Sequence, residues 1–430
     1  MFWEIVMMLF CILLIYKQNN KFELSSSLIF FLLWFFQVAI CFFVEPKYNW
    51  SNSLLFIFGC IVIFLLGNIF ARKYIYTLDN SILLNSNCET SNNLEINQRN
   101  DWIIYVAFWS SFLCGCLGQL LYLRLNGITF YQILTDLPGV NNIMAVKRYQ
   151  TGDTQTLISQ ILLSFTYLVP LLGGFIFLFV DKRLYFLLFS LIPVIFVLIT
   201  SNTKAPLISG SFFLVSSLIV GHLFKYKNYK ELSIKLIITL AVLFIVFLGL
   251  MFLSFSLRYN YFSLEEFKVI LFRIFNYGIG HVFAFDGWFD NYEFTHLDFG
   301  KYTFLAIADK LGIAERVQGV YQDYFEAFDG LISTNVFSYF RGFINDFGII
   351  GTLLLFFAIG VLCGEIEYKV QTNKFTIHSY CTLVILLSFL LYWIVSLFTY
   401  TSYFICFFLF FIFCSLPTVK ANFERVCNGK

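Results

Sequence analysis

Charged residues are scarce in this chain. Asp, Glu, Lys and Arg together make up 13% of its 430 residues, whereas soluble domains average about 25%. The net charge of +2 gives no sign of a polyanion-binding surface. A chain with so few charges and so much apolar surface cannot hide that surface in a water-soluble fold. The composition therefore excludes a soluble enzyme, a disordered protein and a nucleic-acid binder.

The sequence also lacks the short motifs of several common chemistries. It has no HExxH zinc motif, no Walker loop for a nucleotide and no GxSxG nucleophile turn. No acidic pair has the pattern of a metal site beside a glycosyl phosphate, and no internal repeat indicates a transporter built from two related halves. We therefore expect any reaction of this chain to use no metal, no nucleotide and no other cofactor.

Apolar residues are abundant instead. They make up 59% of the chain, 58 of them are Phe, and the mean hydropathy is +0.79. They form long runs separated by short polar segments, whereas a membrane β-barrel would show alternating segments of about ten residues. The sequence therefore predicts an all-α integral membrane protein that crosses the bilayer many times.

A spanning helix needs about 20 mostly apolar residues. We predict eleven spans, at residues 2–16, 24–44, 53–70, 102–125, 157–180, 184–200, 206–224, 234–256, 343–363, 376–398 and 400–416. The first is short and carries Glu4, but it lacks the basic start and the cleavage site of a signal peptide, so we expect a retained helix. The last two are expected to form a tight hairpin around Tyr400 and Thr401.

The distribution of Lys and Arg predicts the orientation of these spans. If the N-terminus lies outside, most basic residues of the short connections fall inside, and the C-terminus is cytoplasmic. Four parts follow: an N-terminal bundle of about eight helices (1–256), a large outer loop (257–342), C-terminal helices (343–416) and a cytoplasmic tail (417–430). The loop is rich in Phe, Tyr and Trp, so we expect it to lie on the membrane surface or fold back over the bundle.

Four cations on the predicted outer face are candidates for binding phosphate. Lys204 lies between two spans in TSNTKAP, where a cation is costly and usually has a reason. Arg258 ends the eighth span, Arg273 lies in an aromatic stretch, and Arg341 precedes the ninth span. Arginine suits phosphate oxygens because its planar fork donates two parallel hydrogen bonds. A snorkelling lysine and surface ion pairs are the alternative interpretations.

Two residues are candidates for proton transfer. His281 lies between glycines in YGIGHVFAFDGW and is an obvious general base near neutral pH, although a packed structural histidine is equally consistent. Asp346 follows Arg341 by five residues and is a candidate to orient it or to act as a base itself, with a purely structural Arg–Asp pair at the helix start as the alternative. The sequence does not rank these against five other carboxylates of the loop: Asp286, Asp290, Glu293, Asp323 and Glu326.

The stretch Thr334–Gly351, TNVFSYFRGFINDFGIIG, opens a late span after a long outer loop. This motif and the whole layout resemble the bacterial O-antigen polymerases, the Wzy-type family that joins oligosaccharide repeat units. Related O-antigen ligases typically carry a His-Asn pair where this chain has Thr334-Asn335, which favours the polymerase. The family's basic residue at the outer end of a middle helix is Lys204 here.

The resemblance implies a GT-C-like membrane glycosyltransferase in the bacterial inner membrane, with its N-terminus and large loop in the periplasm. Its partners would be undecaprenyl-diphosphate-linked donor and acceptor oligosaccharides, membrane lipid and a chain-length regulator. Asn335 and Tyr339 of the motif would join the four cations as substrate contacts, and His281 and Asp346 would be the catalytic residues. An O-antigen ligase, another membrane transferase such as an acyltransferase, and a polysaccharide flippase remain alternative functions.

Overall fold

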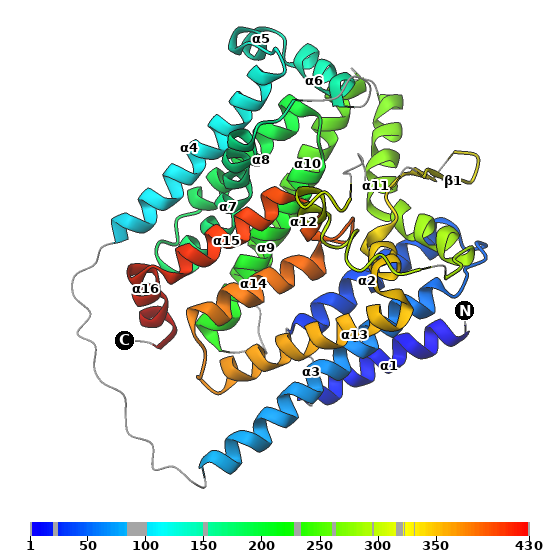
Figure 1. Cartoon of the computed structure of the whole chain (residues 1–430), viewed down its shortest axis with the longest axis vertical. Coiled ribbons are helices and arrows are strands. Elements are labelled where there is room, and N and C mark those ends of the chain that lie inside the picture. The colour runs from blue at the N-terminus through cyan, green and yellow to red at the C-terminus, as the bar shows by residue number, and fades with distance from the viewer. Residues whose placement is uncertain are drawn as a thin grey trace.

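The computed structural model describes residues 2–19, 25–83, 101–148, 154–227, 234–259, 264–294, 296–314, 321, 323–330 and 332–428. Helices run the length of the molecule, and two short strands form one hairpin (Figure 1). The elements are α1 (Phe2–Asn19), α2 (Ser26–Val44), α3 (Ser53–Leu83), α4 (Asp101–Leu125), α5 (Phe130–Thr135), α6 (Leu137–Val146), α7 (Leu157–Phe179), α8 (Tyr185–Ser201), α9 (Ala205–Tyr226), α10 (Ile234–Tyr259), α11 (Leu264–Asp290), α12 (Leu305–Lys310), β1 (Phe325–Ala327), β2 (Ile332–Thr334), α13 (Ser338–Gln371), α14 (Ile377–Leu391), the 3-10 helix η2 (Leu397–Thr399), α15 (Thr401–Ser415) and α16 (Pro417–Asn428).

Eight helices in the described part of the chain are long and apolar enough to cross a membrane, or nine if the bent pair α15–α16 counts as one span. Seven of them, α2, α3, α4, α7, α9, α10 and α13, match predicted spans. The multi-pass membrane character predicted from composition is therefore confirmed.

The predicted number of eleven spans is not confirmed. The apolar part of α1, Val6–Tyr16, and the helices α8 and α14 are shorter than a full span. The helix α15 forms its span only together with α16, across a bend of 73°. The predicted tail 417–430 is therefore largely the helix α16, whose Val419, Phe423 and Cys427 are buried against the bundle.

Glycines let α3 and α13 approach closely. A Cβ at Gly360 would lie 2.1 Å from the carbonyl oxygen of Phe64, and one at Gly364 would lie 2.4 Å from that of Asn68. Small residues four apart are the usual means by which membrane helices bring their backbones together. Gly348 has a different effect: it breaks α13, since its φ of 68° and ψ of 178° lie outside the helical region.

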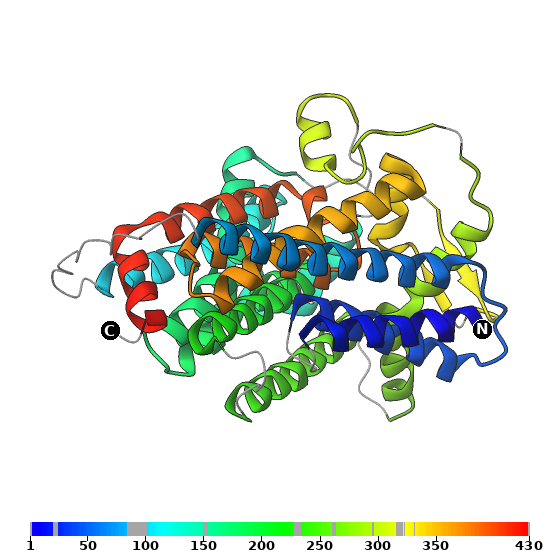
Figure 2. The same cartoon turned by 90° about the horizontal axis from the view of Figure 1, so that it is seen from below.

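The helix α11 lies inside the segment predicted to be an outer loop. Its length and composition would let it span a membrane, but its two halves contact the same end of the bundle. Ile270 packs with Leu198 of α8 and Leu207 of α9, near the turn that joins those helices. Asp286 accepts hydrogen bonds from Tyr48 and the connection between α2 and α3. Figures 1 and 2 show α11 running across the long helices. We call this the α11 end.

The helices α14 and α15 form an interrupted hairpin. Each has 15 residues and is about 22 Å long, whereas the hydrocarbon core of a bilayer is about 30 Å thick. The helix in the predicted span 376–398 ends early, at Leu391, so it is too short to cross the bilayer. Residues 392–400 are largely non-helical yet mostly buried. Non-helical backbone at this depth is tolerated where protein covers it. Here the amide of Tyr339 donates to the carbonyl of Trp393 over 3.1 Å.

A buried ion pair joins α3 to α13 toward their other ends. Arg72 donates to the fully buried carboxylate of Glu367 over 2.6 Å, and Asn68 donates to the same oxygen. The other carboxylate oxygen of Glu367 accepts the backbone amide of Ser26 at 2.7 Å. Three helices are therefore tied together through one carboxylate. Removing one partner of such a pair typically costs about 3–5 kcal/mol, because the remaining charge stays buried.

We predict that Arg72→Ala lowers the thermal unfolding temperature of the purified protein in detergent by several degrees, because it leaves Glu367 charged and buried. The matched control is Lys369→Ala, which breaks the exposed pair Glu365–Lys369 two residues further along α13 and should change stability by less than about 1 kcal/mol. Equal unfolding temperatures for the two variants would contradict the structural role of the buried pair.

Candidate functional site

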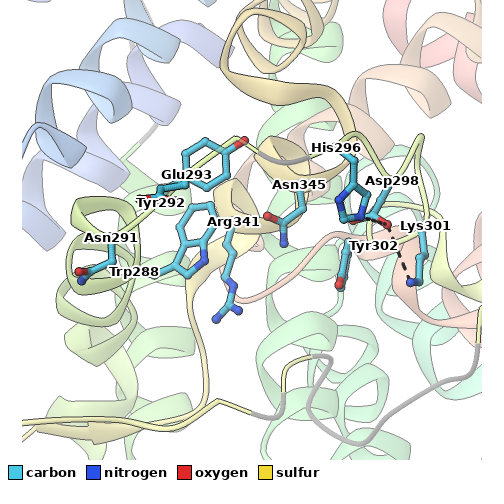
Figure 3. Close-up of a pocket in the computed structure, with 10 residues that line it drawn as sticks. All are labelled: Trp288, Asn291, Tyr292, Glu293, His296, Asp298, Lys301, Tyr302, Arg341 and Asn345. Atoms are coloured by element: carbon cyan, nitrogen blue, oxygen red, sulfur yellow. Dashed lines mark ion pairs between the residues drawn. The ribbon is translucent and has the colours of Figure 1, made fainter.

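A polar cavity of about 430 Å³ opens at the α11 end (Figure 3). Its wall comes from the end of α11, the segment that follows it and the first turns of α13. The lining residues are Trp288, Asn291, Tyr292, Glu293, His296, Asp298, Lys301, Tyr302, Arg341 and Asn345. Aromatic rings, amides and charges of both signs therefore meet in one place.

Arg341 lies in a box of aromatic rings. Its guanidinium carbon is 4.1 Å from the ring centre of Tyr321, 4.3 Å from that of Phe337 and 5.3 Å from that of Trp288. The residue is 8% exposed. The faces of aromatic rings attract cations, and the attraction grows when water is excluded. Burial raises the pKa of Tyr321 well above its usual range, so this ring contacts Arg341 as a neutral phenol.

The hydrogen bonding of Arg341 is incomplete. Its Nη2 donates to the carboxylate of Asp323. Its Nε and Nη1 are buried and have no hydrogen-bond partner in the described part of the chain. Leaving a buried donor without an acceptor costs about 1–3 kcal/mol, and more for a charged group. The guanidinium is therefore held in place with capacity for a further anionic acceptor.

Asp346 organises the opposite wall of the cavity. Its two carboxylate oxygens accept the backbone amides of Tyr302, at 3.0 Å, and Thr303, at 2.5 Å. The carbonyls of Asn345 and Asp346 accept the amides of Asp298 and Phe299. This side chain is fully buried and does not line the cavity. Asp346, predicted to be catalytic or to orient Arg341, is therefore placed to hold the segment 298–303 against α13.

Asp298 and Lys301 of the segment that Asp346 holds line the cavity, and His296 lines it from just before that segment. His296 Nε2 lies 3.7 Å from Asp298 Oδ1, and Lys301 Nζ lies 3.9 Å from the same oxygen. Figure 3 shows these three side chains together on one side of the cavity, with Asn345 between them and Arg341. Glu293 lines the cavity from the segment directly after α11 and is exposed. The cavity therefore offers a fixed cation and at least two proton acceptors.

Lys204 and Arg273 do not meet Arg341 in the cavity. Lys204 is buried at the start of α9, where its Nζ donates to Asn202 over 2.8 Å and lies 4.6 Å from the ring centre of Phe255. Arg273 is exposed on α11, about 22 Å along the helix from the cavity residue Trp288. Arg258 lies in α10, but its side chain is outside the described residues.

The remaining predicted contacts also lie elsewhere. His281 is 1% exposed and packs between the indoles of Trp34 and Trp393, at 5.8 and 5.7 Å between ring centres. Neither of its ring nitrogens has a hydrogen-bond partner in the described part of the chain. Tyr339 is buried and accepts the indole N–H of Trp34 at 3.2 Å. Asn335 is exposed and does not line the cavity.

The five alternative carboxylates have different places. Asp286 is 2% exposed and anchors the connection between α2 and α3 by accepting from Tyr48, Ser51 and Ser53. Burial, together with the charge of Asp286, raises the pKa of Tyr48. Asp290 and Glu326 are exposed outside the cavity. Glu293 lines the cavity, and Asp323 pairs with Arg341.

Sequence reasoning missed most of the residues that surround Arg341. Trp288 and Tyr321 are 53 and 20 residues before it, and neither has a spacing that would link it to an arginine. His296 and Lys301 lie in the predicted outer loop, but no motif singles them out. The one available signal was the density of aromatic and polar residues in 286–302.

Comparison with known proteins adds no assignment. No family model matches the sequence, no curated protein matches it, and no solved structure matches its fold. Within the described residues, no three His, Cys, Asp or Glu side chains gather closely enough to hold a metal ion. The functional interpretation therefore depends on the geometry of the cavity and on the sequence motif.

We predict that Asp346→Ala exposes the segment 298–303 to proteolysis, because two backbone amides lose their acceptors. Tryptic cleavage after Lys301, followed by mass spectrometry under native conditions, should become faster by on the order of tenfold. Asp290→Ala, which removes an exposed carboxylate at the end of α11, serves as the control. Unchanged cleavage at Lys301 in the Asp346 variant would show that other contacts hold the segment.

Proposed function

We propose that this chain is a membrane glycosyltransferase of the O-antigen polymerase type. It would transfer a growing glycan from a polyprenyl diphosphate to the sugar of a new lipid-linked repeat unit, at the periplasmic face of the bacterial inner membrane. The observation that carries the proposal is Arg341, a buried arginine with unused hydrogen-bond donors at the wall of a polar, aromatic cavity. The α11 end would then face the periplasm.

The leaving group explains the need for such a cation. When the bond between the anomeric carbon and the phosphate oxygen breaks, the diphosphate keeps the electron pair and its negative charge increases. A fixed donor in a water-poor site stabilises that charge at no cost of reorganisation, and removing one such donor typically costs 10²–10³-fold in rate. The aromatic box around Arg341 supplies the fixed position and the low polarity.

The acceptor hydroxyl must lose a proton as its oxygen bonds to the anomeric carbon. Two groups of the cavity wall have the right chemistry: the carboxylate of Glu293 and the imidazole of His296, which lies near Asp298. The proton would pass to one of them. Loss of activity in His296→Gln at full expression, with activity kept in Glu293→Gln, would identify the histidine, and the opposite result would identify the carboxylate.

The rings of Trp288, Tyr292 and Tyr302 suit the sugars. All three line the cavity, and their apolar faces can stack against the C–H faces of a pyranose while Asn291 and Asn345 bond to hydroxyls. The donor is already activated by its diphosphate, so the reaction requires no nucleotide sugar. Because rings and amides line it, the cavity wall suits a carbohydrate better than an acyl chain, and this favours glycosyl transfer over acyl transfer.

A flippase is the second candidate, and two observations favour it. Arg72 and Glu367 form an ion pair that is buried within the bundle. The interrupted hairpin α14–α15 resembles the discontinuous helices of transporters. Deletion of the gene separates the functions. Loss of a polymerase leaves single repeat units on the outside of the cell, whereas loss of a flippase leaves them trapped on the cytoplasmic side.

We predict that Arg341→Ala, expressed in a strain without its own copy, reduces long surface polysaccharide to single repeat units. Rates should fall by at least about 100-fold, because the leaving diphosphate loses its fixed donor. Arg341→Lys should recover part of the length, since it keeps the charge but loses the planar fork. Polysaccharide gels provide the readout.

Lys310→Ala is the matched control, because Lys310 is an exposed cation on α12 that pairs with Asp309 outside the cavity. It should give normal chain lengths. Each variant is checked by its amount in the membrane fraction. Normal ladders from Arg341→Ala at full expression would refute the role of Arg341 in the reaction.

A further inference from the structure

The ion pair of Arg341 is unequal. The arginine side chain is 10% exposed, whereas the side chain of its partner Asp323 is 62% exposed. Asp323 lies two residues before β1. The strand β1 pairs with β2 in a hairpin that packs on α11. The cation is thus fixed by helices and aromatic rings, while the anion is near the surface and is held by a small hairpin.

We infer that Asp323 determines which anions reach Arg341, and that it selects a diphosphate over a singly charged phosphodiester. This inference rests on the proposed function and concerns the selectivity of the same site. Asp323 occupies Nη2 and neutralises the guanidinium until a ligand with more negative charge displaces it.

The argument begins with the surroundings of the site. A buried cation at a membrane surface meets a large excess of lipid headgroups, and each phosphodiester carries one negative charge. A headgroup that bonded to the open Nε and Nη1 beside Asp323 would place two anions on one cation, and a headgroup that displaced Asp323 would only exchange one monoanion for another. Asp323 is also tethered, so its effective concentration is high. The exchange therefore gains nothing, and the site is not blocked by lipid.

A diphosphate differs in both charge and geometry. It carries at least two negative charges, and its oxygens can accept hydrogen bonds from the edge of the guanidinium. That edge includes the Nε and Nη1 that have no partner in the described part of the chain. When a diphosphate displaces Asp323, the guanidinium gains more hydrogen-bond acceptors than the one it loses. Selectivity of this kind is a difference between two affinities, obtained by penalising the wrong ligand.

The test measures binding of two soluble probes to the purified chain in phosphatidylcholine nanodiscs. Inorganic pyrophosphate represents the diphosphate, and dimethyl phosphate represents the phosphodiester. The parent protein should bind pyrophosphate and should not measurably bind dimethyl phosphate. Asp323→Asn should bind both, so that its preference for pyrophosphate falls by at least about tenfold. Asp323→Glu, which keeps the charge, should retain the parent preference.

Two further variants make the result decisive. Glu326→Gln removes an exposed carboxylate from β1 of the same hairpin and should behave like the parent. Arg341→Gln should lose pyrophosphate binding, and normal binding by this variant would refute the anion site of the proposed function itself. If Arg341→Gln loses binding but Asp323→Asn keeps the parent preference, only the selectivity role of Asp323 is overturned. Thermal unfolding of each variant verifies that it is folded.

Discussion

A charged group that leaves water must find partners inside the protein, and this requirement organises the α11 end and the helix bundle alike. Glu367 accepts from Arg72, Asn68 and a backbone amide. Asp286 and Asp346 are each satisfied by several donors and thereby fix a connection. In all three cases the desolvation cost of the carboxylate is offset by hydrogen bonds that also set the backbone path.

Arg341 departs from this rule. Rings cover its faces and Asp323 takes one nitrogen, but two buried donors keep no acceptor within the described residues. A native structure tolerates such a group where binding or chemistry requires it. Asp346 has all its hydrogen bonds and lies outside the cavity, so it is suited to maintain the site. Arg341 lacks hydrogen-bond partners and lies at the cavity wall, so it is suited to a ligand.

The membrane character and most spans could be predicted from the sequence because they depend on local composition. The helix α11 could not, since Phe267–Asp290 reads equally as a span or as a surface segment, and only its contacts at both ends place it across the bundle. The span at α14 was predicted too long because residues 392–398 are mostly apolar whether helical or not, whereas the predicted span 400–416 agrees with α15. Arg341 was a candidate because it lies in the motif that opens a late span and because arginine suits phosphate oxygens. His281 shows the limit, because its flanking glycines say nothing of the two indoles that enclose it.

The interrupted hairpin has a consequence for how the chain enters the bilayer. Neither α14 nor α15 is long enough to cross alone. Between them, the carbonyl of Trp393 accepts the amide of Tyr339 on α13, and the hydroxyl of Thr399 donates to the carbonyl of Tyr302, in the segment before α12. Such a pair is poorly suited to leave the translocon one helix at a time. The two helices would have to insert as a unit, after α13. The earlier part of the chain would then provide the surface on which the hairpin α14–α15 packs.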